Sequence, residues 1–300
     1  PEFLAEGTAI EDLRKPDRVL IGGEDQKALN ILSSIYENWI PKEKVLKTNL
    51  WSSELSKLTA NAFLAQRISS VNSISALCES TGADINEVAM AVGLDKRIGN
   101  KFLKAGPGFG GSCFQKDILN LVYICRSYGL DEVADYWESV VKINNWQRRR
   151  ISSKVVENLF GTVTGKKIAI LGFSFKANTN DTRESSSIFI SQDLIENGAI
   201  LSIHDPKVSE KQIKNIMQNN QLITEFSEGS WEYQTNMYNA IESSDAIIVL
   251  TEWEEYSKID WQECYKIMRK PAWVFDTRNI VNKFKILKEG INYWGVGDGN

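Results

Sequence analysis

The stretch Lys167-Ile-Ala-Ile-Leu-Gly172 decides the fold class of this chain. The helical periodicity of the residues before it gives way here to an apolar run that predicts a strand. A helix is predicted next, over residues 185–197, followed by a second strand over 200–204. Further apolar runs predict strands at 246–250, at 273–275 and near Tyr293. Strands that alternate with helices predict a doubly wound, mostly parallel, Rossmann-like sheet.

Ligands of such sheets bind at the carboxyl ends of the strands. That rule selects the stretch Phe173-Ser-Phe-Lys-Ala-Asn178, which follows the first strand, and Asp276-Thr-Arg278, which follows a later one. Lys176 and Arg278 would then converge on a phosphate, or each is an ordinary surface cation. The polar stretch 208–238 predicts only loops and a helix.

Helical periodicity dominates residues 51–160, interrupted by a loop with Arg97 and by a run of glycines, which predicts a central helical domain. The expected elements are a long helix from Trp51 to a stop at Gly82, and three more helices near 85–92, 112–128 and 131–160. Their large apolar faces favour assembly into a homodimer or a larger homo-oligomer.

Residues 1–50 predict the remnant of an N-terminal α/β domain. A strand is expected at 18–21, a helix at 25–39 and a second strand at 44–48. Two short strands alone are marginally stable, so we expect an N-terminal portion that is missing here or replaced by a partner chain. The predicted domains are therefore 1–50, 51–160 and 161–300.

The composition describes a globular chain and excludes several classes of function. The 300 residues are 42% hydrophobic and 25% charged, with a net charge of −4, so no basic field favours nucleic acid. No apolar run is long enough to cross a membrane and no signal peptide is visible, which favours a cytoplasmic protein. Four cysteines without a CxxC pair and one histidine, His204, argue against a metal site, and His204 is expected to be structural.

The stretch Gly106-Pro-Gly-Phe-Gly-Gly-Ser-Cys-Phe-Gln-Lys-Asp117 places glycines directly before one cysteine and a helix. Glycines allow the backbone to approach a ligand closely, and a helix N-terminus favours a thiolate or an oxyanion. Asp117 lies one turn after Cys113, which suits a carboxylate and a sulfur that share a water. The alternative is a glycine turn before an ordinary helix with a buried cysteine.

Two further patterns are ambiguous by themselves. Gly106, Gly108 and Gly111 match G-x-G-x-x-G, but no β-branched strand precedes them, so a dinucleotide fingerprint is disfavoured. Lys57 and Asn61 share one face of the first long helix, where a solvated polar face is the favoured interpretation.

Several motifs together, in order along the chain, resemble the nucleotide-sugar 6-dehydrogenases. They are Pro1-Glu-Phe-Leu-Ala-Glu-Gly-Thr8, Lys57-Leu-Thr-Ala-Asn61, Gly108-Phe-Gly-Gly-Ser-Cys-Phe-Gln-Lys-Asp117, Gly172-Phe-Ser-Phe-Lys176 and Asp181-Thr-Arg-Glu-Ser185. The resemblance covers nearly the whole chain. The sequence Phe-Gln-Lys-Asp after the cysteine resembles the corresponding sequence in the family members that act on UDP-glucose. Members that act on GDP-mannose are the alternative.

The resemblance implies oxidation of the C6 alcohol of UDP-glucose to give UDP-glucuronate, with two NAD molecules used in succession. Cys113 would carry the sugar as a thiohemiacetal and then as a thioester. Lys57 and Asn61 would stabilise the oxyanion, Asp117 would orient water, and Glu2 would act as acid and base.

The same resemblance implies the binding residues. Substrate contacts are expected from Phe3, Leu4, Ala5, Glu6, Lys104, Gly106, Gly108, Phe109, Gly110, Phe175, Lys176 and Arg278, and from Arg97 across a subunit interface. NAD contacts are expected from Glu6, Ser112 and Arg183.

The main departure from the family concerns NAD. The N-terminal Rossmann domain, with its own G-x-G-x-x-G, is expected to be absent from these residues, so the chain alone is not expected to turn over. Two other hypotheses compete: a non-catalytic nucleotide-sugar-binding and dimerisation module, and a cofactor-free cysteine hydrolase, which the lone histidine disfavours.

Overall fold

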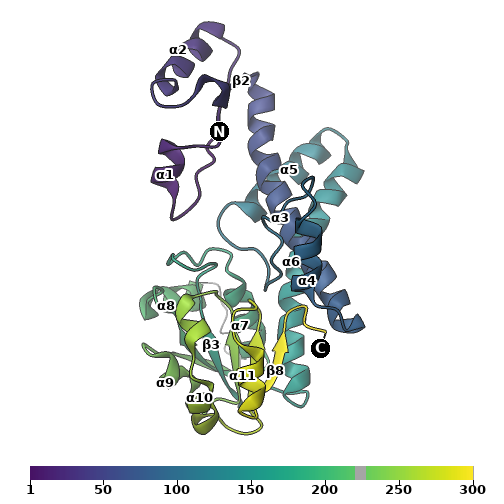
Figure 1. Ribbon diagram of the computed structural model, residues 1–300, viewed down its shortest axis with the longest axis vertical. Coiled ribbons are helices and arrows are strands. Elements are labelled where there is room, and N and C mark those ends of the chain that lie inside the picture. The colour runs from purple at the N-terminus through teal and green to yellow at the C-terminus, as the bar shows by residue number, and fades with distance from the viewer. Residues whose placement is uncertain (220–227, 300) are drawn as a thin grey trace. The chain divides into compact units, whose positions relative to one another are not determined.

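The computed structural model describes residues 1–219 and 228–299 (Figure 1). Contacts divide the chain into two compact units. Unit 1 consists of Pro1–Leu64 and Lys116–Glu138, and unit 2 of Ala65–Gln115 and Ser139–Asn300. The domain limits predicted from the sequence remain predictions.

Unit 1 contains a βαβ element. Strands β1 (Val19–Gly22) and β2 (Val45–Thr48) pair in parallel, and helix α2 (Gln26–Tyr36) and the short 3₁₀ helix η1 (Lys42–Lys44) connect them. Its small core is formed by Ile21, Leu29, Ile40 and Val45. The sequence did not predict α1 (Ala9–Arg14), a six-residue helix that is too short to show a clear helical period and that buries no side chain.

The four predicted central helices are confirmed. They are α3 (Leu50–Thr81), α4 (Ile85–Gly93), α5 (Phe114–Ser127) and α6 (Asp131–Asn158). Gly82, at a φ of 78°, follows α3 directly, and the Asp84 carboxylate caps α4 by accepting a hydrogen bond from Asn86 N–H. Helix α5 begins at Phe114, so Cys113 precedes the helix instead of lying in its first turn.

Unit 2 is built on a six-stranded sheet in which every pair is parallel. The strand order among the described residues is β5-β4-β3-β6-β7-β8. This order is doubly wound, which confirms the sheet type that the sequence predicted. The strands are β3 (Lys167–Leu171), β4 (Ile200–His204), β5 (Ser230–Tyr233), β6 (Ala246–Val249), β7 (Trp273–Asp276) and β8 (Asn292–Gly295). Strand β5 lies in the stretch 208–238 and was not predicted; residues 220–227 of that stretch lie outside the described residues.

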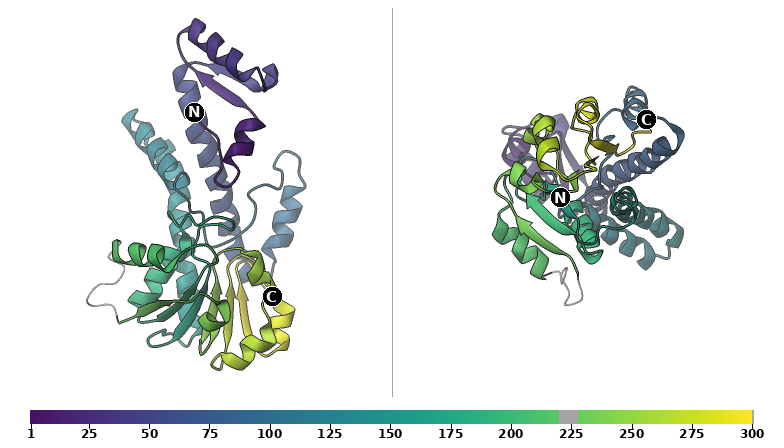
Figure 2. Two further views of the ribbon diagram at one scale, coloured as in Figure 1. Left: turned by 90° about the vertical axis from the view of Figure 1, so that its left-hand side faces the viewer. Right: turned by 90° about the horizontal axis from the view of Figure 1, so that it is seen from below.

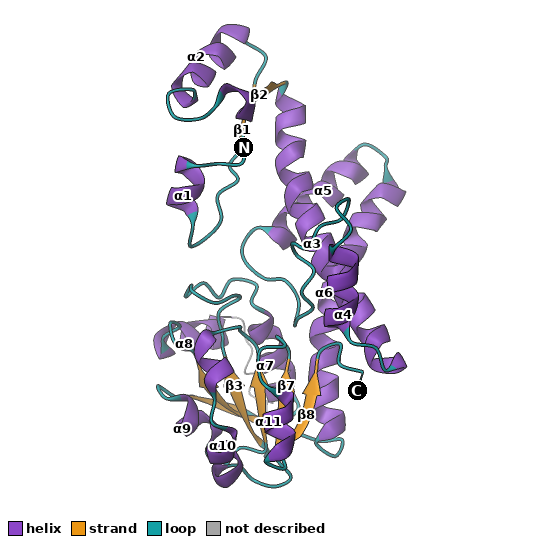
Figure 3. Cartoon of the chain, viewed as in Figure 1, coloured by secondary structure: helices purple, strands orange, loops and turns teal. Residues whose placement is uncertain are grey.

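Helices cover both faces of this sheet (Figures 2 and 3). Ile168 and Ile170 of β3 face one core, which includes α7, α8 and the end of α6, whereas Ala169 and Leu171 face the other core with α9, α10 and α11. The elements not yet bounded are α7 (Ser186–Glu196), α8 (Glu210–Asn219), α9 (Met237–Ile241), η2 (Glu254–Lys258), α10 (Trp261–Ile267) and α11 (Lys283–Lys288). Both faces are therefore buried, as an apolar strand pattern requires.

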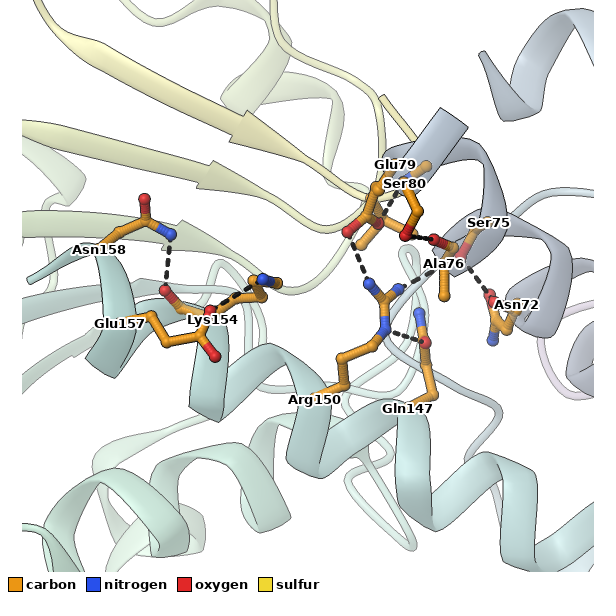
Figure 4. Close-up of polar contacts among 12 residues, drawn as sticks. Asn72, Ser75, Ala76, Glu79, Ser80, Gln147, Arg150, Lys154, Glu157 and Asn158 are labelled. Atoms are coloured by element: carbon orange, nitrogen blue, oxygen red, sulfur yellow. Dashed lines mark hydrogen bonds and ion pairs between the residues drawn. The ribbon is translucent and has the colours of Figure 1, made fainter. Parts of the chain in front are cut away.

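A polar cluster within unit 2 ties α3 to α6 (Figure 4). Arg150 Nη1 lies 2.7 Å from Glu79 Oε2, and its Nε donates to Gln147 Oε1 at 3.1 Å. Glu79 Oε1 also accepts from Gly297 N–H at 2.8 Å, which holds the chain after β8 against α3. The Arg150 and Glu79 side chains are each only 11% exposed, so removing either one would leave a buried charge unpaired and destabilise the fold.

Candidate active site

All four cysteines lie in the described part of the chain: Cys113 is exposed, whereas Cys78, Cys125 and Cys264 are buried. It stands one residue before α5, and its Sγ lies 3.6 Å from Ser112 Oγ. The interpretation of Cys113 as a buried core cysteine is therefore wrong. An exposed thiol at the N-terminus of a 14-residue helix is in an environment typical of a nucleophilic cysteine.

Asp117 lies in the first turn of α5 and is buried. Its Oδ2 accepts a hydrogen bond of 2.6 Å from Nδ2 of Asn61 on α3. Asn61 is itself only 8% exposed, so the prediction of a solvated polar face for this residue is wrong. The amide and the carboxylate hold each other in a fixed orientation within unit 1, which leaves the other carboxylate oxygen available for a water.

The N-terminal segment meets α3 in the same unit. The Phe3 ring has the Arg18 guanidinium at 3.9 Å and the Lys57 ammonium at 5.5 Å from its centroid. Glu2 is exposed, and its Oε1 accepts from Leu4 N–H at 2.6 Å. Unit 1 thus brings Phe3 towards Lys57, and Lys57 lies one helical turn before Asn61 on α3. Leu4, Ala5 and Glu6 are exposed beside them.

The glycine stretch, Gly106 to Gly111, lies in unit 2, where side-chain amides hold its backbone. Asn72 Oδ1 accepts from Gly106 N–H, and Gln147 Nε2 donates to Gly106 C=O, both at 2.8 Å. Asn144 bonds Phe109 in both directions, accepting from its N–H at 2.8 Å and donating to its C=O at 3.1 Å. Four side-chain hydrogen bonds therefore hold the backbone of this loop in place.

Two of its glycines are required by close packing. A Cβ at Gly108, where φ is 117°, would lie 2.7 Å from Asn144 Oδ1. A Cβ at Gly110 would lie 2.5 Å from the Glu184 carbonyl oxygen and 3.0 Å from Phe175 Cβ. The glycine stretch consequently lies against the loop that follows β3.

The carboxyl edge of the sheet meets the same stretch. Arg278 donates to the carbonyls of Leu250 at 2.8 Å and Phe175 at 3.1 Å, and pairs with Glu252 at 3.2 Å. A Cβ placed on Gly106 would lie 3.7 Å from Arg278 Nη1. Arg278 is thus no free surface cation, and burial lowers the pKa of its guanidinium while Glu252 opposes that shift. Lys176 is half-buried next to Phe175.

Three other predicted residues have different surroundings. Arg97 is 89% exposed and pairs with Asp95 at 2.6 Å, and Lys104 is exposed. Arg183 is 63% exposed and binds the Asp181 carboxylate, while its C=O accepts from Gly111 N–H at 2.8 Å. Ser112 is half-buried beside Cys113. Among the described residues, no group of histidine, cysteine and carboxylate side chains is arranged to hold a metal ion.

The sequence reasoning missed the residues that hold the glycine stretch. Asn144, Gln147 and Arg148 are 2% exposed or less, on the same face of α6 as Ile151 and Val155. Polar residues at positions i, i+3 and i+4 of an apolar helical stripe were the available signal.

His204 ends β4 and is buried, as predicted for a structural histidine. Its Nδ1 lies 3.0 Å from Tyr256 Oη and 3.8 Å from Glu255 Oε1. Burial lowers the pKa of His204 below its ordinary value, and the Asp205 carboxylate only partly opposes this shift. The folded state therefore prefers the neutral imidazole.

The substitution His204→Gln is expected to make stability less dependent on pH. The pKa of His204 is lower in the folded than in the unfolded protein, so the unfolded state binds the proton first as pH falls. The stabilisation contributed by His204 is therefore present at pH 7 and is lost as pH falls below about 6.5. The wild-type and H204Q free energies of unfolding in urea should converge between about pH 7 and pH 5, by at most about 1.4 kcal/mol per pH unit. Parallel curves would contradict this role.

Three sequence models of one family match the chain. The NAD binding domain of the UDP-glucose/GDP-mannose dehydrogenase family matches residues 1–40, its central domain residues 51–146, and its UDP binding domain residues 169–283. The expectation that the NAD-binding domain is absent is thus not supported in that form, because residues 1–40 match part of it.

Named relatives agree with these matches. UDP-glucose 6-dehydrogenase of Gallus gallus is 56% identical over 94% of this chain, and that of Drosophila melanogaster 54% over 99%. The chain spans 58% and 64% of their respective lengths. The solved structure of a UDP-glucose dehydrogenase from Pyrobaculum islandicum is 32% identical, with a TM-score of 0.82 over 99% of this chain and 62% of that one. Among the described residues, no helix has the length and apolar character needed to span a membrane.

Proposed function

The chain belongs to the UDP-glucose/GDP-mannose dehydrogenase family, and from this membership we propose that it serves the four-electron, NAD-dependent oxidation of UDP-glucose to UDP-glucuronate. The observation that carries the proposal is the exposed Cys113 at the start of the helix that also holds the Asn61-bound Asp117. The relatives that are more than half identical are named UDP-glucose 6-dehydrogenases, which favours this substrate over GDP-mannose.

We assign the covalent steps to Cys113. Its thiolate attacks the C6 aldehyde, so that a C–S bond forms and the carbonyl electron pair moves to oxygen, giving a thiohemiacetal. Oxidation of this carbon to a thioester requires the loss of a hydride, which NAD would accept. Water then attacks the thioester carbon, the C–S bond breaks, the Cys113 thiolate is regenerated on the enzyme, and UDP-glucuronate is released. Lys57 and Asn61 stabilise the oxyanions, and Asp117 takes the proton of the attacking water.

Glu2 has the earlier task of handling the proton of the C6 alcohol. It is an exposed carboxylate, and its neighbour Phe3 lies close to Lys57 in unit 1. The exposed Leu4, Ala5 and Glu6 provide further contacts to the sugar. These roles rest on the family resemblance together with the proximity of Phe3 to Lys57.

The UDP moiety is proposed to bind where the glycine stretch meets the carboxyl edge of the unit 2 sheet. Arg278 and Lys176 supply positive charge there, and Phe175 provides an aromatic face. In the described part of the chain, the N–H groups of Gly108 and Gly110 have no hydrogen-bond partner and suit phosphate or sugar oxygens. Arg97, which is highly exposed, is proposed to reach the substrate of a second subunit.

NAD would accept the two hydrides, but the βαβ element of unit 1 does not fit its pyrophosphate. The turn after β1 reads Gly22-Gly-Glu-Asp25, with carboxylates at the start of α2. Asp25 already accepts from the N–H groups of Lys27 and Ala28, which a pyrophosphate would need. We therefore expect no NADH from the 300-residue chain alone, although Glu6, Ser112 and Arg183 remain candidate contacts to NAD.

A second candidate function follows from this misfit. The chain would act as a non-catalytic nucleotide-sugar-binding module that assembles as a homodimer through its central helices. Exposed aromatic side chains such as Tyr123 and Tyr128, at 72% and 65%, favour such an assembly. UDP-glucose binding in a calorimeter, without NADH even when a relative's dinucleotide-binding domain is supplied, would favour the module.

UDP-glucose is expected to protect Cys113 from iodoacetamide. Peptide mass spectrometry of the native chain should show fast labelling of Cys113 alone, because the other cysteines are buried. If the ligand covers the thiol, labelling should slow about 100-fold at a UDP-glucose concentration about 100 times Kd. GDP-mannose at the same concentration is the matched control. Labelling that UDP-glucose leaves unchanged would count against the proposed function.

A further inference from the structure

Arg148 of α6 makes contacts to two segments that are far apart in sequence. Its Nη2 donates to the carbonyl of Phe109 at 2.7 Å, in the glycine stretch, and to the carbonyl of Glu184 at 2.9 Å. Its Nε donates to Ser186 Oγ at 3.2 Å. One guanidinium thus holds the glycine stretch and the turn 181–186 together, and the contacts all lie in unit 2.

The two segments also touch each other directly. Gly111 N–H donates to Arg183 C=O, and a Cβ on Gly110 would collide with Glu184 C=O. Asn144, by contrast, bonds within the described residues only to the glycine stretch, through the backbone N–H and C=O of Phe109. Arg148 and Asn144 therefore differ in one respect: only Arg148 also holds the second segment.

The charge of Arg148 is not neutralised by an ion pair. No carboxylate is among its hydrogen-bond partners in the described residues, and the guanidinium instead lies 4.0 Å from the centroid of the Phe189 ring. Burial lowers the pKa of Arg148 to about 10, with the Glu184 carboxylate opposing the shift, so the side chain stays charged at neutral pH. A planar fork can bond two carbonyls and a hydroxyl at once, which a lysine ammonium on a flexible stem does poorly.

We propose that Arg148 is a positioning residue that couples the glycine stretch to the turn 181–186, so that a UDP-sugar bound to the first segment also orders the second. The inference rests on the proposed function, in which the glycine stretch binds the UDP-sugar and Arg183 faces NAD. UDP-sugar binding would therefore also order the turn 181–186, which contains the proposed NAD contact Arg183, without the sugar nucleotide touching that turn.

Hydrogen exchange followed by mass spectrometry tests the coupling in the 300-residue chain. In the absence of ligand, R148K should exchange at least about tenfold faster than wild type in peptides covering both 104–113 and 179–187, because charge-assisted bonds are lost at both. N144A should accelerate only 104–113. Two controls on α6 are R149K, which changes an exposed neighbour, and V155A, which weakens the buried core of unit 2.

UDP-glucose supplies the second arm. It should slow exchange of both segments in wild type and of only the glycine stretch in R148K. The proposal is overturned if R148K leaves 179–187 unchanged, or if V155A accelerates the two segments as much as R148K does. Should R148K fail to fold, wild type decides: protection confined to 104–113 also overturns it. If calorimetry shows no UDP-glucose binding, the proposed function fails, while the ligand-free arm still judges the coupling.

Discussion

Replacing Cys113 by serine should lower the rate of UDP-glucuronate formation by at least about 10,000-fold, the scale seen when a covalent nucleophile is removed. A serine hydroxyl is scarcely ionised at neutral pH and is a poor leaving group, so neither the adduct nor its hydrolysis is accessible. In the proposed mechanism, the first oxidation, from alcohol to aldehyde, does not use the thiol. C113S should therefore give at most one equivalent of NADH and no glucuronate.

Because we propose that the 300 residues alone give no NADH, the chain is assayed as a fusion to the N-terminal residues of the Gallus gallus relative. NADH is followed by absorbance and the sugar nucleotide by mass spectrometry. Cys125→Ser is the matched control, because Cys125 is a buried cysteine on the same helix α5. It should reduce stability while leaving kcat of the folded enzyme close to wild type. Glucuronate formation by C113S at more than about 1% of the wild-type rate would refute the covalent role.

The elements that the sequence predicted best are a nearly all-apolar strand and two long helices. The residues of β3 are buried on both faces, and α3 and α6 are long, so local pattern and final structure agree there. Strand β5 was missed because it is an edge strand whose side chains alternate between exposed and half-buried positions. An edge strand carries too few apolar side chains to stand out from a polar loop.

The candidate site was predictable in its residues but not in its contacts. Motifs selected Asn61 and Asp117 separately, yet their hydrogen bond joins residues 56 apart in the chain, which no local pattern encodes. Local reasoning even favoured solvent exposure for Asn61. Arg148 carried no motif, because its importance comes from two carbonyl oxygens that only the folded backbone brings together.

Asp205 is expected to contribute more to the stability of unit 2 than any capping residue. It is 2% exposed, directly after β4. Its Oδ2 accepts from the N–H groups of Phe173 and Ser174 and from the Trp253 indole, at 2.7, 3.0 and 3.2 Å. Its Oδ1 accepts from the N–H groups of Lys207 and Val208, at 2.8 and 2.9 Å. One carboxylate therefore satisfies donors from three loops at the carboxyl edge of the sheet.

The substitution Asp205→Ala leaves these donors buried without acceptors, and at about 1 kcal/mol each the free energy of unfolding should fall by about 4–5 kcal/mol. Asp260→Ala is the matched control: Asp260 accepts from two N–H groups at the exposed start of α10, so its loss should cost about 1 kcal/mol. Urea unfolding measures both. Phe173 and Ser174 lead directly to Phe175 and Lys176, so loss of the Asp205 carboxylate should disturb the proposed UDP site. In a calorimeter, D205A stabilised by an osmolyte should therefore bind UDP-glucose more weakly than wild type does. Equal losses of unfolding free energy in D205A and D260A would show that the five donors find other acceptors. The carboxyl edge of the sheet would then not depend on the Asp205 carboxylate.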